Sequence, residues 1–306
     1  MNKKYGIGSA LLLVLFLAGV IAGCKSGGTK SAEDEIVTPV NSDNKAIYDD
    51  IKQAEKIFNA LPSPLESAML IKSAGAKFDE AQMNTVSNVN SYVTTKAKAL
   101  NLGIYTCDLS FASLYEQTQL IIDYMNAAKK MADGLGILEA IDQETIDELE
   151  QNINNSEKIM EVVSETFLNS NSYLEENGQP AVAAMVLVGG WFEGLYISTR
   201  LVDMDDFNGN KLVSRIIDQK LSIDILLNLL ESSKGNPAVD ELISEVRKLK
   251  LVFDKISLSA SSVSAEYDKS SNSTMLKSQV RTDMTREVFR ELANTVAEIR
   301  NSFVKI

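Results

Sequence analysis

The sequence predicts an all-α fold, a multi-helix bundle or helical array of eight or more helices. Apolar residues recur at spacings of three and four along most of the chain, and helix start and stop signals separate the runs. No segment shows convincing β alternation and no repeat has a fixed period. Hydrophobic residues make up 45% of the 306 residues and charged residues 24%, which is typical of a globular protein with a core.

The N-terminus predicts secretion and lipid attachment. Lys3 and Lys4 precede an uncharged, mostly apolar run that ends at Cys24. This is the order of a signal peptide, here residues 1–23. The residues Ile21-Ala22-Gly23-Cys24 resemble the lipobox of lipoproteins, which implies acylation of Cys24 and anchoring to a membrane. The alternative, a plain membrane-spanning anchor, is disfavoured because a span needs about 20 apolar residues.

The segment after the cysteine predicts a tether. Residues 24–44 are rich in Gly, Ser, Thr and acidic residues and show no periodicity, so we expect a flexible linker with a span of about 25 Å. Residues 45–306 form the predicted all-helical domain. The sequence leaves open whether this domain is divided into two parts near residue 236.

The first helices have clear signals. An apolar stripe covers Ile47 to Leu61, and Ser63-Pro64-Leu65-Glu66 then reads as a capping box that opens a helix to about residue 74, closed by Gly75. Further helices are expected at about 91–102, 105–134, 142–154, 156–176, 181–202 and 210–235.

The C-terminal part predicts a long helical hairpin. Asn236 and Pro237 mark a helix start, followed by helices Ala238–Asp268 and Thr274–Val304. The Ser-rich turn Lys269–Ser273 joins them.

Missing residue types exclude several kinds of chemistry. The chain contains no histidine, which excludes Ser-His-Asp and Cys-His catalysis and His-ligated zinc. Once Cys24 carries lipid, Cys107 is the remaining thiol, so neither an internal disulfide nor a cysteine metal cluster can form. Cys107 lies in an apolar stretch and is expected to be buried. We expect no cofactor and no metal. The net charge of −12 disfavours nucleic acid as a partner.

The most unusual motif is Val186 to Tyr196. Three glycines in one apolar helix cost roughly 1 kcal/mol each relative to alanine, so a close helix contact should offset them. The favoured interpretation is a core helix with Glu193 paired to a polar or basic group. The alternative is the wall of a ligand cleft. The residues concerned are Gly190, Trp191, Phe192, Glu193, Gly194 and Tyr196.

Asp108 is a second carboxylate in apolar surroundings. Together with Glu193 it would make a glycosidase-like acid and base pair, provided that the two carboxyl groups lie within about 10 Å in an open cleft. The acidic run Asp203 to Asn210 fails the calcium-loop pattern and is expected to be a connector.

Three motifs resemble a group of uncharacterised all-helical lipoproteins of Bacteroidota-type bacteria. They are Ser63-Pro64-Leu65-Glu66, Leu100-Asn101-Leu102-Gly103-Ile104-Tyr105, and the run from Gly189 to Tyr196. The resemblance covers about residues 45–205. The lipobox-like residues Ile21–Cys24 are a further point of resemblance to this group. It implies a lipid-anchored helical domain in the cell envelope, and carries no activity.

The leading functional hypothesis is a non-enzymatic binding or interaction module, anchored in the cell envelope through lipid on Cys24. The outer membrane is the expected location, on either face. The partner is a protein or a small molecule. Alternatives are a carboxylate-dependent hydrolase that uses Glu193 and Asp108, and a structural spacer.

Overall fold

The computed structural model describes residues 61–138, 143–260, 264–268, 273–277 and 280–305. The chain divides into two compact units, residues 1–42 and 43–306, and all described residues belong to the second. The expected signal peptide, Cys24, the tether and the stripe from Ile47 to residue 60 lie outside the described residues.

The described part is helical in its core, which confirms the all-α prediction. It holds nine α-helices and two short 3-10 helices. The α-helices are α2 (Pro64–Ser73), α3 (Thr95–Leu114), α4 (Thr118–Leu135), α5 (Gln143–Gln151), α6 (Ser156–Glu176), α7 (Pro180–Arg200), α8 (Lys211–Ser232), α9 (Pro237–Phe253) and α10 (Arg286–Val304). The 3-10 helices are η1 (Glu80–Gln82) and η2 (Val86–Ser91).

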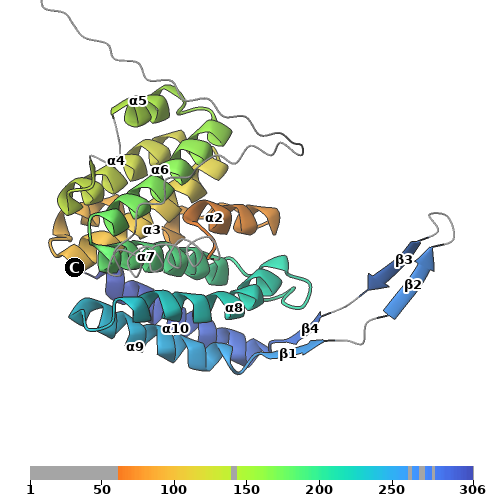
Figure 1. Cartoon of the computed structure of the whole chain (residues 1–306). Coiled ribbons are helices and arrows are strands. Elements are labelled where there is room, and N and C mark those ends of the chain that lie inside the picture. The colour runs from red at the N-terminus through yellow and green to blue at the C-terminus, as the bar shows by residue number, and fades with distance from the viewer. Residues whose placement is uncertain (1–60, 139–142, 261–263, 269–272, 278–279, 306) are drawn as a thin grey trace, which may run out of the picture. The chain divides into compact units, whose positions relative to one another are not determined.

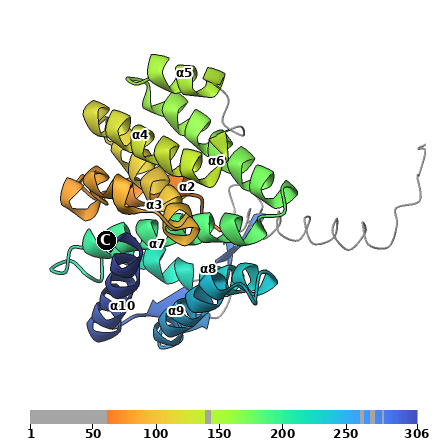
Figure 2. The same cartoon turned by 90° about the vertical axis from the view of Figure 1, so that its left-hand side faces the viewer.

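Helices α3 and α7 form the centre. They pack on each other, and α3 also packs on α2, α4 and α6, while α7 contacts α8 and α10. Figures 1 and 2 show α4, α5 and α6 on one side of this central pair and α8, α9 and α10 on the other. A residue between α3 and α7 is therefore covered from both sides.

Several predicted helix ends are confirmed. At the start of α2, the Ser63 amide donates to Glu66 Oε2 (2.7 Å) and the Glu66 amide donates to Ser63 Oγ (3.2 Å), a complete capping box. Gly75 follows α2 with φ of +84°, where glycine is favoured. Asn210 and Asn236 cap α8 and α9.

The predicted boundary between the second and third helices was wrong. We expected helices 91–102 and 105–134, but α3 runs without a break through Gly103 and ends at Leu114. The chain reverses at Glu116, which has φ of +57°, before α4 begins. Neither glycine nor proline marks this turn, so the sequence carries no ordinary signal for it.

The C-terminal helical hairpin is shorter than predicted. Helices α9 and α10 do pack on each other, but the chain between them forms antiparallel strand pairs instead of helix. Strand β1 (Ser257–Ala260) pairs with β4 (Val280–Asp283), and β2 (Ser264–Asp268) pairs with β3 (Ser273–Lys277). Residues 254–285 are rich in serine and β-branched residues, which are weak helix formers.

Helix α7 is the one helix among the described residues that is long and apolar enough to span a membrane. In the structure 83% of its most apolar window is buried against other helices. Its composition is therefore accounted for by its central position in a helical core.

Candidate functional site

Glycines bring the backbones of α3 and α7 into direct contact. A Cβ atom on Gly103 would lie 2.0 Å from the Val186 carbonyl oxygen, and one on Gly189 would lie 2.0 Å from that of Leu100. No side chain fits at either position without moving a helix backbone. We expected the close approach at Gly190 and Gly194, but the closest backbone contacts lie at Gly103 and Gly189, and Gly194 faces the Ser67 side chain. Packing across this contact offsets the poor helix propensity of glycine.

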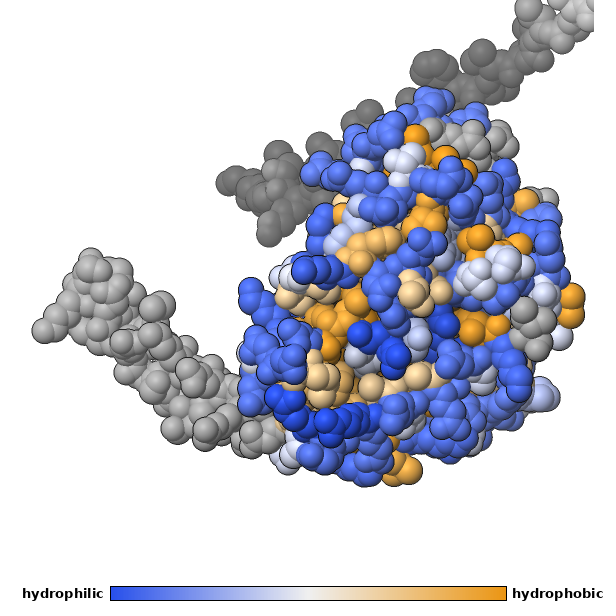
Figure 3. Space-filling view, turned by 180° about the vertical axis from the view of Figure 1, so that it is seen from behind, coloured by the Kyte–Doolittle hydropathy of each residue, from blue (hydrophilic) through white to orange (hydrophobic). Residues whose placement is uncertain are grey.

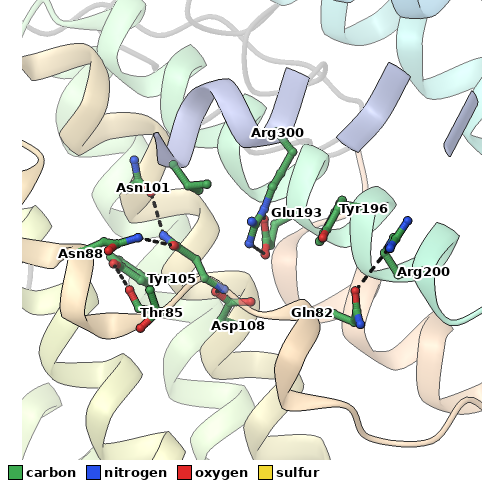
Figure 4. Close-up of polar contacts among 12 residues, drawn as sticks. Gln82, Thr85, Asn88, Asn101, Tyr105, Asp108, Glu193, Tyr196, Arg200 and Arg300 are labelled. Atoms are coloured by element: carbon green, nitrogen blue, oxygen red, sulfur yellow. Dashed lines mark hydrogen bonds and ion pairs between the residues drawn. The ribbon is translucent and has the colours of Figure 1, made fainter. Parts of the chain in front are cut away.

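Glu193 is paired with a residue far away in the sequence. Arg300 of α10 donates from Nε to Glu193 Oε2 and from Nη2 to Glu193 Oε1, both at 2.6 Å (Figure 4). The Glu193 side chain is 0% exposed and that of Arg300 7%. The guanidinium also lies 4.5 Å from the centroid of the Tyr196 ring. Burial acts to lower the pKa of Arg300, but the charge and hydrogen bonds of Glu193 outweigh burial and raise this pKa overall.

The other members of the motif are core residues. Phe192 is fully buried and packs edge-on against Trp191 and Phe303. Trp191 is 3% exposed, and its indole N–H donates to Gln219 Oε1 at 3.0 Å. A recess of only ≈ 20 Å³ adjoins Trp191 and Gly194. The core interpretation of this motif is confirmed, and the cleft-wall interpretation is not supported.

Asp108 lies beside this ion pair. The backbone N–H of Asn84 donates to Asp108 Oδ2 at 3.1 Å. Asp108 Oδ1 has no hydrogen-bond donor among the described residues. Burial raises the pKa of Asp108 well above its usual range, the neighbouring Glu193 raises it further, and Arg300 opposes both. A protonated Asp108 can donate to Glu193, which satisfies the otherwise unpaired oxygen.

Two asparagines, Asn84 and Asn101, lie beside Asp108, Glu193 and Arg300. The side-chain Nδ2 of Asn84 donates to Tyr92 Oη (3.1 Å) and to Asn101 Oδ1 (3.0 Å). Asn101 in turn donates to the Phe303 carbonyl at 3.0 Å, and Tyr92 donates to the Val304 carbonyl at 3.2 Å. These bonds attach the end of α10 to α3 and to Tyr92, which precedes α3.

The structure therefore brings the two predicted carboxylates together but buries them. Both Asp108 and Glu193 are 0% exposed. The hydrolase hypothesis required an open cleft at this pair, and the geometry does not provide one. Cys107 is also fully buried, as predicted, and burial raises the pKa of its thiol.

An open apolar pocket lies elsewhere, on another face of α3. It has a cavity volume of ≈ 80 Å³ and is enclosed by α3, α4, α5, α6 and α7. Its apolar lining residues are Leu102, Leu109, Met125, Ala128, Leu149, Val163, Phe167, Leu174 and Val186. Most of these side chains are buried, so the pocket presents an apolar interior.

Polar groups occur at a few points of this pocket. Asn126 and Lys129 of α4 are exposed at its edge. Asn171 of α6 is 7% exposed, and its Oδ1 atom has no hydrogen-bond donor among the described residues. An apolar cavity with a few placed polar groups is the usual form of a small-molecule site.

The outer surface as a whole is mixed. Figure 3 shows apolar side chains in several patches on the face seen from behind, each bordered by hydrophilic residues. Within the described ranges, no group of three or more His, Cys, Asp or Glu side chains is arranged to hold a metal ion.

Sequence reasoning missed Arg300 and the pocket. Arg300 interrupts the apolar stripe of α10, which is formed by Phe289, Leu292, Val296, Ile299 and Phe303. A basic residue at a core position of a helix predicts a buried acidic partner, so the sequence did contain a signal for the pair. The pocket had no comparable signal, because ordinary aliphatic residues from five helices line it.

Comparison with protein-family models, with curated proteins and with solved structures finds no match. The resemblance of three motifs to helical lipoproteins stays a prediction.

Proposed function

We propose that the protein is a lipid-anchored cell-envelope protein whose helical unit binds a small, mainly apolar molecule. The pocket enclosed by α3, α4, α5, α6 and α7 carries this proposal. It combines buried aliphatic walls with exposed polar residues at its edge, which suits a ligand with one apolar end.

The anchor part of the proposal comes from the chain start. The lipobox-like residues Ile21 to Cys24 supply an acyl acceptor, and a lipid on Cys24 would hold the helical unit at a membrane without spanning it. The expected site is the outer membrane. The apolar helix α7 needs no membrane, because it is buried against its neighbours.

Binding is preferred over catalysis because of where the titratable groups lie. Asp108, Glu193 and Arg300 are sealed between α3, α7 and α10, where they pair with one another. The pocket is lined by aliphatic, hydroxyl and amide groups and by Lys129, which offer contacts but no acid and base pair.

A blocking substitution tests the binding site. Ala128 lines the pocket and is partly buried, so Ala128→Trp should fill it, and ligand-observed NMR should then show loss of toluene and phenol binding to the full-length chain. Ala238→Trp is the control, because Ala238 is also partly buried but lies on α9, outside the pocket. Equal binding by both variants, or no binding by the native chain, would reject the site.

The anchor is tested separately. Intact-mass analysis of membrane-extracted protein should show a chain that starts at Cys24 and carries acyl groups. A Cys24→Ala variant should retain residues 1–23 and carry no lipid. An unmodified Cys24 in the native protein would remove the anchor from the proposal and leave the pocket unaffected.

A further inference from the structure

The Asn171 side-chain amide uses its nitrogen but not its oxygen in hydrogen bonds among the described residues. Its Nδ2 donates to Glu175 Oε1 at 3.3 Å, one turn along α6. Its Oδ1 atom is buried and has no donor among the described residues. A buried acceptor without a partner costs free energy that a well-packed apolar side chain would not.

A second buried asparagine shows what full pairing looks like in the same fold. Asn101 accepts from Asn84, and its Nδ2 donates to the carbonyls of Ala97 (2.9 Å) and Phe303 (3.0 Å). Asn101 therefore joins three parts of the structure. Asn171 joins none, since its one described bond is to its own helix, and it lies at the wall of the pocket.

We infer that Asn171 is the specificity-determining residue of the pocket, and that its Oδ1 accepts a hydrogen bond from a hydroxyl-bearing apolar ligand. This inference rests on the proposed binding function and names the ligand class. A hydroxyl supplies the missing donor, and the rest of the ligand contacts the aliphatic lining. A ligand without a donor would leave Asn171 Oδ1 unpaired in the complex and would lose the corresponding affinity.

The size of the pocket limits the ligand. Its cavity volume of ≈ 80 Å³ is smaller than the roughly 150 Å³ of an engineered cavity that holds benzene. The enclosed part therefore holds a chain of a few carbons or part of one small ring, and the rest of the ligand must extend through the open side. Lys129 at the edge is available to an acidic group there, since it makes no ion pair with the described residues.

Phenol and toluene test the inference because they have nearly the same shape and differ in the donor. Calorimetric titration of the full-length chain should show phenol binding about fivefold tighter than toluene. In Asn171→Leu, which keeps the size of the side chain, toluene should become the tighter ligand. Equal affinities for the native chain would overturn the role of Asn171 and leave the binding function standing. Absence of binding by both would overturn the two proposals together.

Thermal unfolding gives a second readout that a structural role would not produce. Asn171→Leu should unfold at the same or a higher temperature than the native chain, because it removes an unpaired buried group. Asn101→Leu is the matched control and should unfold at a lower temperature. A large fall in the unfolding temperature of Asn171→Leu would show that Asn171 stabilises the fold and would count against the inference.

Discussion

Two buried regions border the central helices α3 and α7, and they differ in how their polar groups are satisfied. On one side, Arg300 bonds to Glu193, Asn84 bonds to Asn101, and Asn101 bonds to the backbone of α10. On the other side, the pocket is aliphatic, and its one deeply buried amide lacks a donor among the described residues. The first region has the character of a structural core, and the second is the region where we propose that a ligand binds.

Unusual residues and functional residues therefore need not coincide. The glycines, the tryptophan and the carboxylates that stood out in the sequence belong to the region where packing is tightest. Burial of a charge in a core costs free energy unless the charge is paired. A charged residue in an apolar stretch of sequence therefore stands out for a reason unrelated to ligand binding. Four measurements on the tightly packed region test whether the two regions differ in this way.

The largest effect is expected from Arg300→Met. It leaves Glu193 buried without its partner and should lower the free energy of unfolding by about 3–5 kcal/mol in chemical denaturation. The double variant Glu193→Met/Arg300→Met should recover much of this loss, since it removes both charges. If the double variant is as unstable as the single one, the pair stabilises the fold by more than the neutralisation of two buried charges.

Gly103→Ala should have the next largest effect. Its Cβ would meet the Val186 carbonyl oxygen at 2.0 Å and the Gly190 nitrogen at 2.6 Å, so α3 and α7 must separate, with a cost of about 3 kcal/mol. Gly134→Ala is the control, because the nearest atoms there belong to the flexible Lys98 side chain. Similar unfolding free energies for the two variants would contradict the close helix contact.

Asp108→Asn should change the pH dependence of stability. The raised pKa of Asp108 means that the folded state keeps a proton that the unfolded state releases above about pH 4. Its contribution therefore decreases as the pH rises from about 4 towards the raised pKa. The amide of the variant cannot titrate but can still donate to Glu193, so the variant should gain stability relative to the native chain as the pH rises. A constant difference between the two unfolding curves, measured from pH 4 to 8, would refute a protonated Asp108.

The smallest effect concerns Trp191 and leaves the protein unaltered. Because the indole is 3% exposed and hydrogen-bonded to Gln219, its fluorescence should be blue-shifted and weakly quenched by acrylamide. Phenol at saturating concentration should leave this quenching unchanged, since Trp191 does not line the pocket. Strong quenching would mean that the tightly packed region opens in solution.

The sequence predicted much of the fold because local signals dominate in helical proteins. The capping box at Ser63, the prolines at 64, 180 and 237 and the asparagines at 210 and 236 marked helix starts correctly. The turn at Glu116 was missed because an ordinary residue adopts its left-handed conformation. The strands near 257–283 were missed because pairing between distant segments leaves a weak pattern in serine-rich sequence.

The candidate site was predicted only in part. The sequence identified Asp108 and Glu193 as carboxylates in apolar surroundings, and the structure brings them together. Burial and the choice of partner depend on the packing of α10 against α7, which the sequence does not specify. Asn171 gave no signal at all, because an asparagine on a polar-faced helix is unremarkable until its neighbours are known.

The attachment of α10 also bears on the order in which the core can form during synthesis. Glu193 meets its counter-charge at Arg300, and Asn101 and Tyr92 meet the carbonyls of Phe303 and Val304. A nascent chain that has emerged only as far as α9 therefore holds an uncompensated carboxylate between its two central helices. The final packing of the two central helices therefore depends on α10, which is the last of the described helices to be synthesised.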